Sequence, residues 1–153
     1  PSDVRHHALA LSQQMHALAA LHVKVAFVIV DAAHPSPFLV SGRPPASGLA
    51  WTEPDANMLI AFNAAPGSAA PESDGKDIYG PYALALVEMI REGGLAPATL
   101  FDRVRLRVNQ LSNGAQVPWD ASTVQSKFVF FKRGSGAPPH TAPAVRSWMS
   151  RTW

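Results

Sequence analysis

Residues 23–38, VKVAFVIVDAAHPSPF, begin with an apolar run and end in an acid, two alanines and a proline-framed turn. Six consecutive apolar positions, 25–30, are typical of a strand covered on both faces, as in the parallel sheets of α/β proteins. Asp31 follows where such a strand ends. In open parallel sheets the ligand crevice lies outside the carboxyl ends of the strands. The segment after the strand is therefore the first place to look for chemistry, and Ala32 and Ala33 carry no nucleophilic group.

The composition excludes several classes of function. A chain of 153 residues with 47% hydrophobic and 16% charged residues fits one globular domain. Its thirteen basic residues are scattered and the net charge is +2, so no nucleic-acid partner is predicted. With no cysteine and no metal-ligand spacing among six histidines, neither a metal site nor a cofactor is expected. The longest apolar stretch falls short of the ~20 residues that a membrane span needs, so no membrane partner is predicted.

Apolar spacing and turn signals predict six elements. Pro81 and Pro97 stand at the first position of the two helices predicted in the second half of the chain. Proline is favoured there because this position needs no N–H donor. Two long loops rich in small residues leave the first two strands at the same end, where together they would wall a crevice. In chain order the elements are a helix over 4–21 capped by Ser2 or Asp3, strands over 23–30 and 58–62, helices over 81–92 and 97–111, and a strand over 128–131.

Two features of these elements lead to further predictions. The outer face of the 97–111 helix carries Asp102, Arg103, Arg105 and Arg107 and is expected to face solvent. Three strands leave an uncovered sheet edge, which proteins avoid. The sheet is therefore predicted to be incomplete, with further strands supplied by an N-terminal portion of the same domain.

Five motifs occur in the order DAAHPSPF at 31–38, IAFNAAPG at 60–67, GPYA at 80–83, FDRVRLRV at 101–108 and GAQVPWDAS at 114–122. In this order and spacing they resemble the bacterial caspase-like, metacaspase-related cysteine peptidases of clan CD. The resemblance covers about residues 8–131. It implies an α/β caspase-haemoglobinase-like sandwich, with a mostly parallel sheet flanked by helices and with its N-terminal strands missing from this chain.

The resemblance also implies that the catalytic dyad is absent. In the family the corresponding strand ends in Asp-Ala-Cys-Arg, and a histidine on an earlier strand activates the cysteine. By position, Asp31 matches the acid, Ala33 the cysteine and His34 the arginine, while the family's histidine would precede residue 1. Alanine has no lone pair with which to attack a carbonyl. His34 has no group to activate, and Ser36 and Ser41 lie in no strained elbow, so none of them is predicted to replace the nucleophile.

Recognition is the function that the resemblance leaves open. The family's acid two residues before the cysteine lines a pocket for arginine or lysine, which makes Asp31 a predicted substrate-binding residue. Asp74 and Asp77, in the second long loop, are predicted to join that pocket. The alternative for Asp31 is a structural cap on the turn that follows it, and the alternative for the other two is a solvated loop. Trp119 and Tyr82 are expected to be core residues.

These observations predict a caspase-like pseudopeptidase that retains a crevice for basic peptide segments. The alternatives are a segment of an active cysteine endopeptidase that was processed or whose nucleophile was replaced deliberately by alanine, and an interaction domain without a crevice. Residues 1–131 are assigned to the C-terminal portion of a caspase-like domain and residues 132–145 to a linker. Residues 146–153 form a short tail, in which Trp148 and Trp153 are expected to pack on the domain or on a partner.

Overall fold

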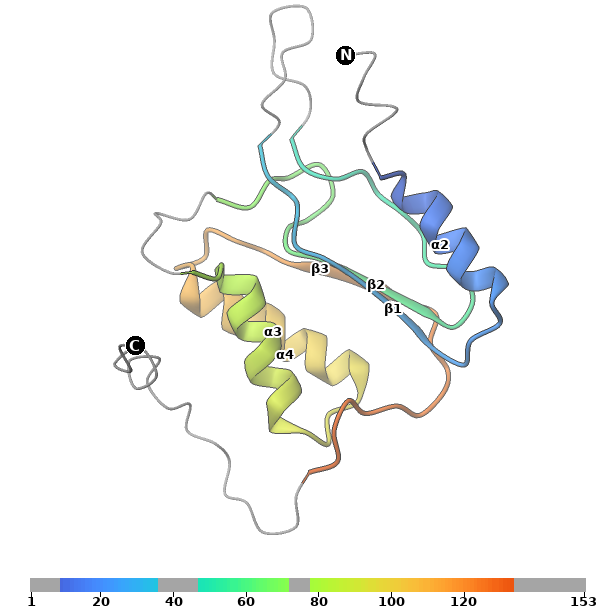
Figure 1. Cartoon of the computed structure of the whole chain (residues 1–153). Coiled ribbons are helices and arrows are strands. Elements are labelled where there is room, and N and C mark those ends of the chain that lie inside the picture. The colour runs from blue at the N-terminus through green and yellow to red at the C-terminus, as the bar shows by residue number, and fades with distance from the viewer. Residues whose placement is uncertain (1–8, 36–46, 72–77, 134–153) are drawn as a thin grey trace, which may run out of the picture.

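The computed structural model describes residues 9–35, 47–71 and 78–133, which form a sheet between two helical layers (Figure 1). The three strands lie in the order β1-β2-β3, with β1 parallel and β3 antiparallel to β2. One helix, α2, covers one face, and α3 and α4 cover the other. The predicted α/β fold is thus confirmed. The elements are α2 Leu11–Ala20, β1 Ala26–Val30, β2 Met58–Phe62, α3 Pro81–Glu92, α4 Pro97–Leu111 and β3 Trp119–Ser122.

The central strand β2 has neighbours on both edges and helices on both faces. All five of its residues are buried, as its unbroken apolar sequence predicts. Leu59 and Ala61 belong to the core beneath α3 and α4. The other three residues of β2 pack on the opposite face with Met15 of α2. Because successive side chains of a strand alternate between its faces, β2 ties both layers into one core.

The predicted boundaries of α3 and α4 are confirmed. Each helix has proline in its first turn, and α3 ends before Gly93 and Gly94. The outer face of α4 was predicted to face solvent, but its arginines form ion pairs with acids of neighbouring elements. Arg103 lies 2.6 Å from the carboxylate of Glu92 and Arg107 lies 2.8 Å from that of Glu88. These pairs join α4 to α3 at the surface, and Arg105 reaches β3.

The third strand was predicted in the wrong place. Residues 128–131 form no strand; the third strand is β3, Trp119–Ser122, which pairs with β2 from Phe62 to Leu59. Its sequence, WDAS, is poor in β-branched residues and so carries a weak strand signal. The apolar residues after it serve packing instead, since Phe128 and Phe130 each lie 4.9 Å from the ring of Phe27.

The first helix and first strand are shorter than predicted. Leu9 and Ala10 are not helical, and α2 starts at Leu11 without a side-chain cap; Ser2 and Asp3 lie outside the described residues. The strand begins at Ala26 because the chain turns after α2 through His22, whose φ is 52°. The apolar pattern of the sequence extends beyond the residues that are helical or extended in the structure, so it placed these ends too far out.

The strand β1 is an edge of the described sheet. Within residues 9–35, 47–71 and 78–133 its only ladder partner is β2. Its residue Ile29, on the same face as Ala61 of β2, is 36% exposed. The sequence predicts cover on both faces of this strand, and the described helices provide it only in part. None of the described helices is long and apolar enough to cross a membrane.

Candidate functional site

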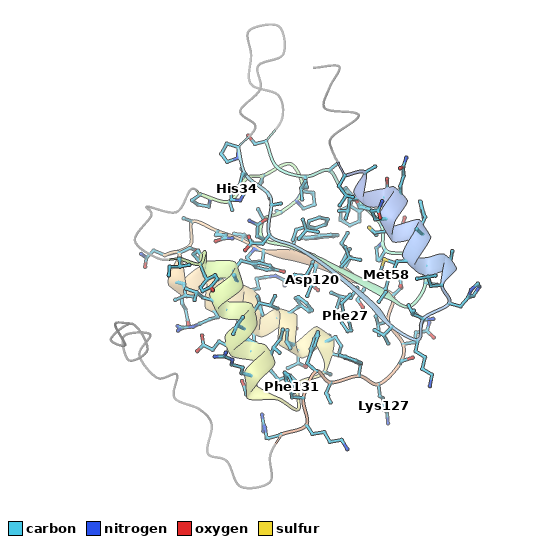
Figure 2. The ribbon with its side chains drawn as sticks, in the orientation of Figure 1. Phe27, His34, Met58, Asp120, Lys127 and Phe131 are labelled. Carbon is cyan, nitrogen blue, oxygen red and sulfur yellow. The ribbon has the colours of Figure 1, made fainter. Side chains whose placement is uncertain are left out.

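The candidate site lies where the chain leaves the carboxyl ends of β1 and β2. The N–H of Asn63 donates to the carbonyl of Val30 at 3.1 Å, which extends the parallel ladder beyond the last strand pair. Asp31 and Asn63 are therefore neighbours just outside the sheet. His34 lies at this end of the molecule, whereas Lys127 and Phe131 lie at the other (Figure 2).

The backbone around Ala33 is held firmly. Its N–H donates to the side-chain Oδ1 of Asn63 at 3.0 Å, and its carbonyl accepts the N–H of Ala70 at 2.6 Å. Ala33 is 1% exposed, and it packs with Ala64, Ala70 and the partly buried Leu49. The position predicted for the family's nucleophile is thus enclosed in a cluster of small apolar side chains.

The side chain of Asn63 joins the two ends of this turn, and sequence reasoning missed it. Its Oδ1 accepts the N–H of Ala33, and the amide is also a neighbour of the Asp31 carboxyl, whose pKa it acts to lower. Gln116 in turn donates from Nε2 to the main-chain carbonyl of Asn63 at 2.9 Å. Both amides are buried, at 1% and 4% exposed. The available signal was one polar residue directly after the fully apolar β2, inside the motif IAFNAAPG.

Asp31 is an exposed acid on this anchored turn. Partial burial of its carboxyl raises the pKa above the ordinary value of 3.8, while the charge of His34 and the hydrogen bond from Asn63 oppose the rise. The geometry presents a carboxylate at a strand end and fixes the chain beneath it. Such a group can accept a charge-assisted hydrogen bond from a cationic ligand.

Two further polar groups lie close to this end of the sheet, Tyr82 in the first turn of α3 and Asp120 on β3. Tyr82 is a core residue, as predicted, at 1% exposed. Burial raises the pKa of its phenol, and the negative charges of Asp31 and Asp120 add to the rise. Asp120 of β3 accepts a hydrogen bond from Nη2 of Arg105 at 2.6 Å. Burial raises the pKa of the Asp120 carboxyl, and the Arg105 guanidinium opposes this. Sequence reasoning assigned no role to the hydroxyl or to Asp120.

Other residues considered from the sequence are either not placed by the structure or lie away from the site. Asp74 and Asp77 lie outside the described residues, as do Ser36 and Ser41. Among the residues that the structure describes, no group of three histidine, aspartate or glutamate side chains is arranged to hold a metal ion. Trp119 is only half-buried and stacks on Phe62, with ring centroids 5.9 Å apart.

A cavity of about 260 Å³ lies elsewhere, between the start of α4 and the segment that follows β3. Pro97, Ser122 and Lys127 are among its lining residues. Ser122 pairs with Leu59 near the beginning of β2, so the cavity is at the opposite end of the sheet from Asp31. The chemistry of the candidate site therefore does not depend on it.

A family model described as the caspase domain matches residues 7–129. The chain belongs to the caspase domain family. Neither a curated protein nor a solved structure matches it. The matched region includes every described element from α2 to β3. The chain is thus a caspase domain without any cysteine, and the predicted caspase-like family and fold are confirmed.

The raised pKa of Asp31 leads to a testable prediction for this caspase domain. At about pH 7 the ionised carboxyl is disfavoured in the folded chain, so Asp31→Asn is expected to increase the free energy of unfolding. As the pH falls through the raised pKa, the wild-type carboxyl takes up a proton, and the advantage of the variant is expected to vanish below 3.8. Urea unfolding across this range measures the difference.

Glu53→Gln, which removes the charge of an exposed loop carboxylate, is the matched control for the Asp31 variant. A lower stability of Asp31→Asn than of the wild type at about pH 7 would contradict the prediction. That result would identify the carboxylate as a stabilising cap of the turn, the alternative role considered from the sequence.

Proposed function

We propose that the chain is a catalytically inactive, metacaspase-related caspase module that recognises basic peptide segments at the carboxyl end of β1. The supporting observation is Ala33. It occupies the position of the family's nucleophile by sequence, and its methyl group is enclosed with Ala64 and Ala70. Covalent catalysis needs a thiol, hydroxyl or comparable nucleophile at this position, and alanine supplies none.

The turn around Ala33 is built for binding instead of reaction. The Asn63 amide accepts the N–H of Ala33 and is a neighbour of the Asp31 carboxyl, so the acid precedes an anchored backbone. A preorganised carboxylate at the surface pairs well with a guanidinium, which offers a planar fork of N–H donors. Arginine or lysine segments of a peptide or protein are therefore the ligands proposed for this site.

A partner strand is also proposed, from the N-terminal portion of the same domain. The outer edge of β1 has no ladder partner in the described part of the chain, and the strand carries the apolar sequence AFVIV. Apolar edges of this kind are covered in native proteins because they otherwise pair with other chains. A strand alongside β1 would also cover Ile29.

Binding is tested by titrating the full chain with a short acetylated peptide that carries one arginine. We expect Asp31→Ala to weaken binding at least ~10-fold, because a charge-assisted hydrogen bond contributes more than about 1.4 kcal/mol. Glu53→Ala, which removes an exposed acid elsewhere, is expected to bind like the wild type. Equal binding by both variants would exclude Asp31 from recognition.

Ala33→Cys tests the loss of catalysis. The new sulfur would lie within the alanine cluster, so we expect no turnover of arginine or lysine reporter peptides and slow reaction with a thiol reagent in the folded state. Unfolding in denaturant should restore rapid reaction, which serves as the internal control. Turnover by this variant would instead identify an intact peptidase whose nucleophile alone had been replaced.

A further inference from the structure

The hydroxyl of Tyr82 is buried without a hydrogen-bond partner in the described part of the chain. Tyr82 lies in the first turn of α3, and its ring packs in the core between α3, α4 and the sheet, at 1% exposed. Phenylalanine would fill the same place without burying an unsatisfied polar atom. Unpartnered buried groups are rare in native proteins, and a ligand or ordered water is a common reason for them.

The strand register directs two acids to the face of the sheet on which Tyr82 packs. Ile29, Ala61 and Asp120 lie side by side across the three strands and so face the same layer. Asp31 follows Ile29 by two residues, which directs it to the same face. Tyr82 packs in the cluster that contains Ala61 of the central strand. Its ring therefore packs on the face of β2 that carries Ala61, the face to which Asp31, just after β1, and Asp120 of β3 are directed.

The two acids differ in how far their charge is compensated. Asp120 is paired with the guanidinium of Arg105 at 2.6 Å, so its charge is largely neutralised within the domain. Burial raises the pKa of Asp31, and the neighbouring His34 and the amide of Asn63 oppose the rise. Burial raises the pKa of the Tyr82 phenol, and the negative charges of Asp31 and Asp120 add to the rise. The groups left to accept hydrogen bonds from a ligand are the carboxylate of Asp31 and the phenol oxygen of Tyr82.

We propose that the Tyr82 hydroxyl is the inner contact of the basic-peptide site and that it favours arginine over lysine. This rests on the proposed recognition of basic segments at Asp31. A guanidinium is a rigid fork that donates to two acceptors at once, here the carboxylate of Asp31 and the oxygen of Tyr82. An ammonium group is a compact charge that is satisfied by the carboxylate and water. The hydroxyl is closed to solvent, so the arginine side chain reaches it by displacing a covering group.

The test uses Tyr82→Phe in the full chain, titrated with acetylated peptides that carry one arginine, one lysine or one citrulline. We expect the variant to lose about tenfold in affinity for the arginine peptide, as for one hydrogen bond to a charged group, and less than about threefold for the lysine peptide. Citrulline, which keeps the shape without the charge, should bind weakly to every variant. Tyr79→Phe, at the second and exposed tyrosine of the chain, is the matched control and should change nothing.

Thermal unfolding of the unbound variant separates recognition from structure. We expect Tyr82→Phe to melt at or above the temperature of the wild type, because it removes an unsatisfied buried hydroxyl. Unchanged arginine binding in Tyr82→Phe, with binding lost in Asp31→Ala, overturns the inference and leaves the proposed function standing. Equal losses for arginine and lysine together with a lower melting temperature also overturn it. Absence of binding by the wild type overturns the proposed function and this inference with it.

Discussion

Asn63→Ala is expected to lower the free energy of unfolding by about 2–4 kcal/mol, because it leaves the buried N–H of Ala33 without an acceptor. The substitution also removes the neighbouring amide that acts to lower the pKa of Asp31. Each loss acts on the turn after β1, so the stability effect should be accompanied by weaker binding of the arginine peptide. Denaturant unfolding and the peptide titration measure the two effects.

Asn109→Ala is the matched control, since Asn109 is exposed on α4 and its substitution is expected to change stability by less than about 0.5 kcal/mol. Asn63→Asp refines the result. Aspartate retains an oxygen for the N–H of Ala33 but replaces the donor by a second negative charge beside Asp31. We expect this variant to fold with less loss at acidic than at neutral pH. A neutral effect of Asn63→Ala would mean that the amide does not hold the turn.

Gly48→Ala is expected to destabilise the fold by about 2–5 kcal/mol through backbone strain and overpacking together. Gly48 has a φ of +77°, a conformation that a side chain disfavours, and a methyl group there would overlap the main-chain oxygen of Ser68. The two loops are joined next to this point, where the N–H of Gly67 donates to the carbonyl of Leu49 at 3.0 Å. Leu49 packs on the Ala33 cluster, so its displacement should loosen the cover of the nucleophile position.

Gly67→Ala separates the two causes. Gly67 has a similar φ of +74°, but an added methyl group would meet nothing within 4 Å. We expect this variant to lose only the strain, about 1–2 kcal/mol. Comparable losses for both variants, measured by denaturant unfolding, would show that the contact between Gly48 and Ser68 contributes little. Protease sensitivity of the loops reports whether the cover over Ala33 has opened.

The sequence predicted the parts of the fold that local patterns encode. The apolar run of β2, the prolines that begin α3 and α4, and the glycines after α3 were each sufficient to place an element, because period and turn chemistry are properties of neighbouring residues. β3 escaped prediction because its four residues, WDAS, become a strand only through pairing with β2. The segment after it was predicted as a strand because it is apolar. Its phenylalanines are apolar, and they pack on Phe27.

Only some residues of the candidate site could be predicted from the sequence. Asp31 at a strand end and the missing nucleophile at Ala33 were both visible in one stretch of sequence. Asn63 was not, since nothing in an isolated asparagine indicates that it will bond a residue thirty positions earlier. Tyr82 was assigned to the core because its ring belongs to an apolar stripe, so its hydroxyl was given no role. Asp120 was given no role because its strand was not predicted.

By itself, the sequence determined that this is a caspase-family α/β chain with no thiol to act as a nucleophile. Family motifs and residue types are carried by the chain whatever its conformation. Only the tertiary structure decided that Ala33 is enclosed, that Asn63 accepts its N–H, and that the Tyr82 hydroxyl is buried without a partner in the described part of the chain. Those facts depend on strand register and loop closure, which bring together residues that are far apart in sequence.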